Sequence, residues 1–140
     1  MMKGIFWSLI VIFVFVNTFL VNIVVHEWGH YLAADYYELQ PEITFEFRNL
    51  SLAHFNFNSI AIANTSFIDD RNGEHVVVIA LAGPFFNLFL GVLCLTICIF
   101  WKKGFVKEML FMGFLISLAS FLMNMVSFSG SDGSLIFGSG

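Results

Sequence analysis

Apolar residues gather in three long stretches of the chain, at about residues 5–34, 76–100 and 105–128. Each stretch is long enough to cross a bilayer, because a helix needs roughly 20 apolar residues to span the hydrocarbon core. We therefore expect three transmembrane helices. The last two are joined only by the short basic turn 101–104, which makes them antiparallel neighbours.

The residues between the first two stretches follow a different pattern. Apolar and polar residues alternate along 43–48, and period-two positions continue to about residue 62 with a slip at Ala53 and His54. This alternation is typical of half-buried strands. We predict a β-rich, membrane-associated insertion at about 42–68. Its exposed edge can hold an extended peptide by main-chain hydrogen bonds, or the sheet can merely cap the helices, and the pattern leaves both readings open.

Composition places these elements in a membrane. The chain is 59% hydrophobic and only 11% charged, and its mean hydropathy is +0.86. Soluble domains carry about 25% charged residues, so we expect an integral, multi-pass protein, most simply of the cell membrane.

The predicted fold class is a membrane all-α core of about three transmembrane helices, with a small β-rich insertion between the first two, in one domain over residues 1–140. A net charge of -4 argues against nucleic acid as a partner.

The first stretch ends in a motif that carries chemistry, because residues 26–30 read His-Glu-Trp-Gly-His. Two histidines four residues apart share one face of a helix, so both rings can reach one zinc ion at about 2.0 to 2.1 Å. Glu27 lies beside them, placed to act as general base on a water molecule at the metal. Ionisable groups at membrane depth are costly and usually mark function. His26 and His30 are therefore candidate metal ligands, and Glu27 is the candidate catalytic residue.

A third ligand is expected after the third stretch. The run 129–133 contains helix-breaking residues and leaves the Asp132 carboxylate on irregular backbone. The first and third stretches cross the membrane in one direction and the second in the other, so the histidine motif and Asp132 return to the same side. Two histidines, one carboxylate and an open fourth position suit a catalytic zinc ion. We predict that Asp132 completes this site, with Zn²⁺ as the cofactor.

Two asparagines lie at the same expected level of the membrane. Asn87 is flanked by Gly83 and Gly91 at four-residue spacing, and Asn124 lies near the end of a row of glycine and serine residues in the third stretch. Small residues at this spacing let helix backbones approach closely, and an amide among them can be presented to a neighbour. Asn87 and Asn124 are candidate substrate-binding residues. The alternative is that their amides only join the helices.

In combination these motifs resemble the site-2 protease family of intramembrane zinc metalloproteases. The resemblance rests on residues 26–30, on Ala-Gly-Pro-Phe-Phe-Asn at 82–87, and on Asn124 placed eight residues before the Asp-Gly pair that begins at Asp132. It covers nearly the whole chain, and three motifs in order are far more specific than any one of them.

The resemblance implies a three-helix catalytic core with zinc held by two histidines and an aspartate, a glutamate as general base, and two asparagines that help to engage substrate. The residues at these positions are His26, His30, Asp132, Glu27, Asn87 and Asn124. The chain departs from the family in its last motif, where Ser127, Gly130 and Ser131 occupy the stretch that usually carries prolines and a leucine.

The predicted function is zinc-dependent hydrolysis of peptide bonds in transmembrane or membrane-associated proteins. A transmembrane substrate must unwind locally before attack, because its carbonyls are held in helix hydrogen bonds. The alternative is a catalytically inactive membrane protein that binds partner helices or acts as a metal-binding regulator. The expected partners are a membrane-protein substrate and the lipid bilayer. Whether the chain also binds a second copy of itself or a membrane regulator is left open by the sequence.

Charge gives one indication of sidedness. The lysines Lys3, Lys102, Lys103 and Lys107 lie at the end of the helices opposite the motifs. The positive-inside rule then places the amino terminus in the cytoplasm and the site towards the exterior. The family resemblance implies a site nearer the cytosol, so both orientations stay open.

Overall fold

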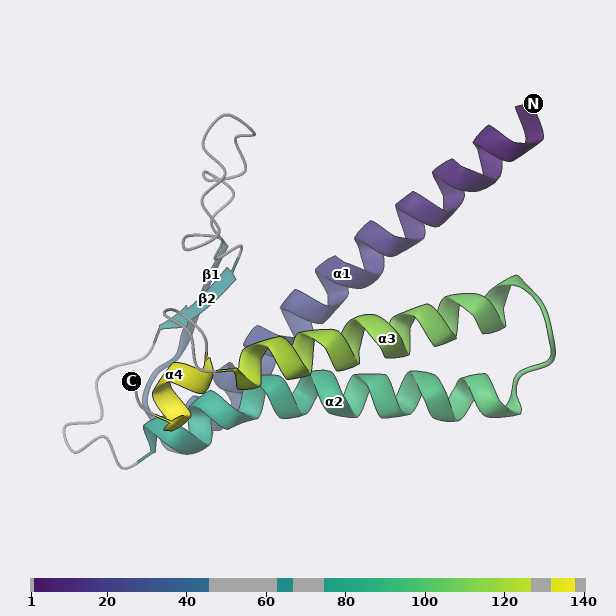
Figure 1. Cartoon of the computed structure of the whole chain (residues 1–140). Helices are drawn as coiled ribbons and strands as arrows, with labels where there is room; N and C mark the ends of the chain where they lie inside the picture. Colours follow the sequence, from purple (N-terminus) through teal and green to yellow (C-terminus); the bar gives the residue numbers. More distant parts are fainter. Residues whose placement is uncertain (1, 46–62, 67–74, 127–131, 138–140) are drawn as a thin grey trace.

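The computed structural model describes residues 2–45, 63–66, 75–126 and 132–137. Four helices and two short strands occupy these ranges (Figure 1). In chain order they are α1 (Met2–Tyr36), β1 (Glu42–Phe45), β2 (Ala63–Ser66), α2 (Val76–Phe100), α3 (Phe105–Met125) and α4 (Asp132–Phe137).

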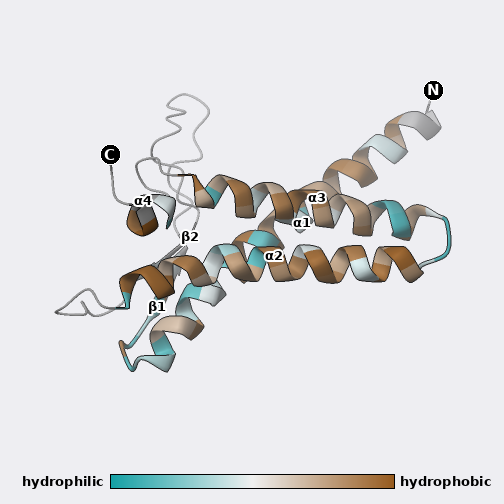
Figure 2. Cartoon of the chain, turned by 60° about the horizontal axis from the view of Figure 1, so that its bottom comes forward, coloured by the Kyte–Doolittle hydropathy of each residue, from teal (hydrophilic) through white to brown (hydrophobic). Residues whose placement is uncertain are grey.

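The predicted fold class and the multi-pass membrane class are both confirmed. Three helices are long and apolar enough to cross a membrane, over Ile5–Tyr36, Val76–Phe100 and Phe105–Met125. Hydrophobic residues predominate along α2 and α3, whereas the turn between them is hydrophilic (Figure 2). The third helix ends at Met125, earlier than the expected residue 128, and the first continues to Tyr36.

Helices α2 and α3 form an antiparallel pair, and α1 crosses this pair obliquely (Figure 1). Near the start of α1 the Trp7 ring still reaches Phe105 at the start of α3, with ring centroids 5.7 Å apart. The 35 residues of α1 have a length of about 52 Å at 1.5 Å per residue. A hydrocarbon core of about 30 Å accommodates so long a helix most readily when the helix is tilted.

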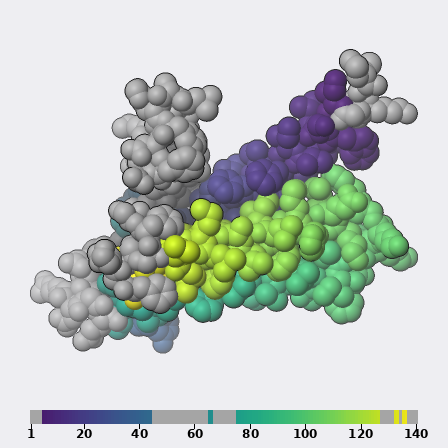
Figure 3. All heavy atoms as spheres, in the orientation of Figure 1, coloured from purple at the N-terminus to yellow at the C-terminus, as the bar shows by residue number. Residues whose placement is uncertain are grey.

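Small residues line the contacts between helices, as their spacing predicted. A Cβ atom added at Gly91 of α2 would lie 3.1 Å from the Ser117 Cβ of α3, and one added at Gly113 would lie 3.3 Å from the Cys94 Sγ. Side chains of α2 and α3 fill the space that separates their ribbons (Figure 3). The backbones can approach this closely because neither glycine carries a side chain.

The two strands pair antiparallel, with Glu42 opposite Ser66 and Phe45 opposite Ala63. Both strands fall inside the predicted β-rich insertion at 42–68. The alternating run predicted from residue 43 to about 62 begins in β1, and its remainder at 46–62 lies outside the described residues. Strand β2 contacts α1, so the sheet lies beside the helix that carries the histidine motif.

One local expectation is wrong. Asp132 was expected on irregular backbone, but it is the first residue of the short helix α4. Helix α4 packs mainly against α2. The predicted return of residue 132 to the histidine motif nevertheless holds, because α4 lies at the end of the helices where α1 finishes and α2 begins (Figure 1).

Candidate metal centre

Three predicted ligands converge in one buried group. His26 and His30 come from α1 and Asp132 from α4, and their ligand atoms all lie within 4.8 Å of one another. The two Nε2 atoms are 3.1 Å apart, the His26 Nε2 is 3.0 Å from the Asp132 Oδ2, and the His30 Nε2 is 3.4 Å from the Asp132 Oδ1. A tetrahedral ion with bonds of about 2.0 to 2.1 Å separates its ligand atoms by about 3.4 Å. The group can therefore hold a metal ion with only small adjustments.

The aspartate has the properties of a metal ligand. Each of its two oxygens faces one imidazole, Oδ2 that of His26 and Oδ1 that of His30. Burial raises the pKa of the Asp132 carboxyl, but the contacts with His26 and His30 outweigh burial and lower the pKa from 3.8 to about 2. The carboxyl is therefore ionised at neutral pH, which is the form that binds cations.

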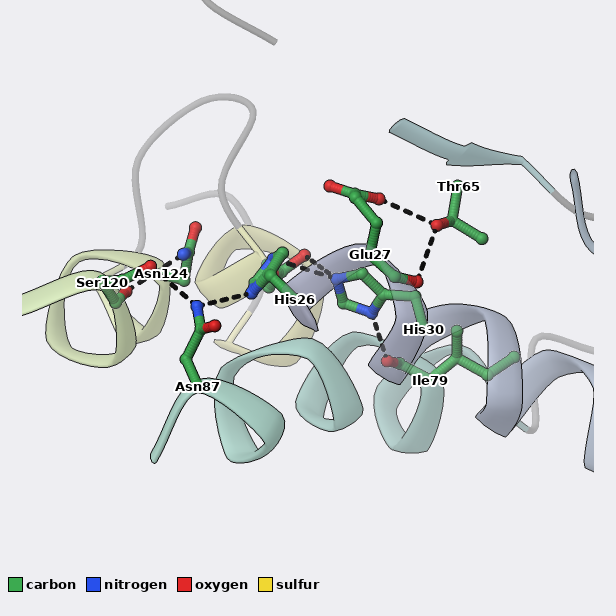
Figure 4. A network of polar contacts seen from close by, with 9 residues as sticks. His26, Glu27, His30, Thr65, Ile79, Asn87, Ser120 and Asn124 are labelled. Carbon is green, nitrogen blue, oxygen red and sulfur yellow. Dashed lines mark hydrogen bonds and ion pairs between the residues drawn. The ribbon is translucent and has the colours of Figure 1, made fainter. Parts of the chain in front are cut away.

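The outer nitrogen of His30 fixes its tautomer. The His30 Nδ1 lies 2.7 Å from the backbone carbonyl oxygen of Ile79 on α2 (Figure 4). Because a carbonyl oxygen only accepts, Nδ1 must carry the proton and donate it, and the neutral ring then keeps its Nε2 lone pair. This arrangement of an outer acceptor and an inner bare nitrogen is usual for histidines that bind metals.

Two glycines make room for the group. A Cβ atom added at Gly83 of α2 would collide with the His30 ring and lie 2.9 Å from the Cε1 atom of His26. A Cβ atom added at Gly133 would lie 2.6 Å from the carbonyl oxygen of Val126 at the end of α3. Because Gly83 has no side chain, α2 can pack directly against the two histidines. Gly133 in the same way lets the first turn of α4, which carries Asp132, approach the end of α3.

Glu27 is buried beside the ligands and is held by the sheet. The Thr65 hydroxyl of β2 lies 2.8 Å from the Glu27 Oε2 and 3.1 Å from the Glu27 carbonyl oxygen, both as acceptors. Figure 4 shows the Glu27 side chain directed towards Thr65. The sequence pattern did not single out Thr65, because a threonine in a short strand is common and no regular spacing links it to Glu27, 38 residues earlier in the chain.

The two predicted substrate-binding asparagines have different surroundings. The Asn87 amide is buried between His26 and Ser120, whose Oγ accepts a hydrogen bond from the Asn87 Nδ2 at 2.7 Å. The Asn124 Nδ2 donates instead to the Ser120 carbonyl oxygen of its own helix, at 3.0 Å. Their role in binding substrate stays a prediction.

The centre lies inside the membrane-spanning segments. His26 is ten residues before the end of α1 at Tyr36, and Asn87 is eleven residues after the start of α2 at Val76. At 1.5 Å per residue these positions are about 15 Å and about 16 Å from the helix ends. The two neighbours are thus at matching depth, well below the ends of the helices that carry them.

Comparisons with known proteins found no matching family model, no matching curated protein and no matching solved structure.

Proposed function

We propose that the chain is an intramembrane zinc metalloprotease of the site-2 protease type. The observation that carries the proposal is the buried group of His26, His30 and Asp132, placed within apolar helices and next to the buried carboxylate of Glu27. Two imidazoles and one carboxylate at tetrahedral spacing favour zinc, which suits nitrogen and oxygen donors in four-coordinate sites.

Bound zinc supplies a Lewis acid that activates water at neutral pH and polarises a carbonyl. Glu27 takes one proton from the attacking water and delivers it to the nitrogen of the leaving amine, while the remaining hydroxyl becomes part of the new carboxyl group. The Thr65 hydroxyl donates a hydrogen bond to the Glu27 Oε2. We infer that the other carboxylate oxygen, Oε1, carries the proton.

The substrate class follows from the surroundings of the centre. A peptide bond inside a helix hides its carbonyl in a hydrogen bond, so a transmembrane substrate has to unwind before attack. Strand β2 contacts α1 and holds Glu27 through Thr65. An unwound peptide that pairs with an edge of the β1–β2 sheet is kept extended next to the centre. The substrates we infer are membrane proteins with a locally unstable transmembrane segment.

The proposal is tested on detergent-purified protein by metal analysis and by cleavage of a model transmembrane peptide. We expect about one zinc ion per chain in the parent. The variants His26→Ala, His30→Ala and Asp132→Ala should lose both zinc and cleavage. His75→Ala is the matched control, because this histidine stacks on Tyr37 and is not one of the three ligands; it should keep its zinc.

Full zinc content in all three ligand variants would overturn the metal site. Stoichiometric zinc without any cleavage, across several peptides of different sequence, would favour the alternative of an inactive membrane protein that binds metal as a regulator.

A further inference from the structure

The outer nitrogen of His26 has an unusual neighbour. The His26 Nε2 faces Asp132 and His30, whereas its Nδ1 lies 3.2 Å from the Nδ2 of Asn87 on α2. The same Asn87 nitrogen lies 2.7 Å from the Ser120 Oγ of α3 (Figure 4). One buried amide thus bridges a metal ligand and a third helix.

In this arrangement the ring is in the wrong tautomer for binding metal. An amide N–H that points at Nδ1 requires Nδ1 to accept, so the proton of the neutral His26 ring is on Nε2. A metal ion needs the lone pair of that same Nε2. His30 has no such conflict, because the Ile79 carbonyl oxygen holds the proton on its Nδ1.

A half-turn of the Asn87 amide removes the conflict. The amide oxygen and nitrogen have nearly the same size, so the turn exchanges them without moving the helices. The Oδ1 atom, which is buried and has no hydrogen-bond partner among the described residues, then accepts from both the His26 Nδ1–H and the Ser120 hydroxyl. In either orientation one of the two amide atoms, Oδ1 or Nδ2, has no described hydrogen-bond partner. The preferred orientation is therefore set by the tautomer of the His26 ring.

We propose that Asn87 is a positioning residue for the metal. Its amide turns when the ion binds, its oxygen holds the proton on the His26 Nδ1, and Ser120 anchors the amide from α3. The inference rests on the proposed metal site but does not require cleavage. It gives Asn87 a task that differs from gripping substrate and from joining helices, because the task depends on an acceptor oxygen at this one position.

The experiment compares zinc dissociation constants, measured by competition with a chelator, for the parent, Asn87→Ala, Asn87→Asp and Asn22→Ala. Loss of an outer hydrogen bond to a metal-binding histidine weakens binding by about 10- to 100-fold, and we expect this in Asn87→Ala. Asn87→Asp restores an acceptor oxygen of the same shape, so its affinity should stay within about threefold of the parent.

Asn22 provides the matched control. It is 1% exposed where Asn87 is 0% exposed, it precedes His26 by one helical turn, and its Nδ2 donates to the Thr18 carbonyl oxygen of its own helix. Asn22→Ala should leave the zinc affinity near that of the parent. Melting temperatures measured without and with zinc give the second readout. Loss of a purely structural amide lowers the melting temperature of the metal-free protein, whereas loss of a positioning amide lowers the increment that zinc adds.

A parent without zinc overturns the metal site and this inference with it. If the parent binds zinc and Asn87→Ala binds it equally well, or if Asn87→Asp and Asn87→Ala lose the same affinity, the metal site survives and the role of Asn87 is rejected. Should Asn87→Ala fail to fold, the comparison of Asn87→Asp with the parent decides, since a tenfold loss in that variant contradicts the need for an acceptor oxygen.

Discussion

At the scale of single residues, the ligands and the base have separable tasks. Glu27→Gln keeps the shape of the side chain and an oxygen that can accept from the Thr65 hydroxyl, which now lies 2.8 Å from the Glu27 Oε2. The amide cannot take a proton from water, so we expect cleavage to fall by at least about 100-fold while zinc content stays at the parent level. Metal analysis and peptide cleavage on one preparation check this. Undiminished cleavage would reject Glu27 as the base.

Gly83 offers a sharper test of the centre, because it makes room for the histidines without binding anything itself. The methyl group of Gly83→Ala would collide with the His30 ring and lie 2.9 Å from the His26 Cε1, and we expect loss of most zinc binding. Gly113→Ala is the control. Its methyl group would lie 3.3 Å from the Cys94 Sγ in the α2–α3 contact, so it should affect stability but not zinc. Equal zinc in parent and Gly83→Ala would show that the ion is bound elsewhere.

At the scale of elements, the sequence predicted what length and spacing control. The three apolar stretches gave α1, α2 and α3 because transmembrane helices follow from local hydrophobicity. The histidine pair followed from four-residue spacing along one helix. Helix α4 could not be predicted, because six residues carry too little local signal and its place is set by packing on α2. The Thr65 contact was missed for the same reason, since it joins elements that only the fold brings together.

The Thr65 hydroxyl links the β1–β2 sheet to the proposed base Glu27. Removing this hydroxyl should lower the rate of cleavage without changing zinc binding. Thr65→Val keeps the branched shape and removes the hydroxyl that now lies 2.8 Å from the Glu27 Oε2. We expect kcat for peptide cleavage to fall about tenfold through a less well-held base, with zinc content unchanged. Thr65→Ser keeps the hydroxyl and should stay near the parent. If Thr65→Val and Thr65→Ser have the same kcat as the parent, the sheet does not position Glu27.

At the scale of the whole molecule, three spans place the two ends of the helix bundle on opposite sides of the membrane. The centre, Asp35 and the β1–β2 sheet lie at one end, and the α2–α3 turn with Lys103 lies at the other (Figure 1). This arrangement matters for function, because it decides from which side water and the unwound peptide reach the centre. The positive-inside rule predicts the turn in the cytoplasm and the centre towards the exterior, whereas the resemblance to the site-2 protease family predicts a centre nearer the cytosol.

Cysteine labelling in intact cells tests both the span count and this assignment. In a background with Cys94 and Cys98 replaced by alanine, Asp35→Cys and Lys103→Cys each present one thiol at an exposed position. Three spans require that a membrane-impermeant maleimide labels one of these variants in intact cells and the other only after permeabilisation. The positive-inside rule predicts that Asp35→Cys is the one labelled in intact cells. The reverse pattern keeps the three spans and turns the centre towards the cytosol, whereas labelling of both variants from the same side would contradict the three-span fold.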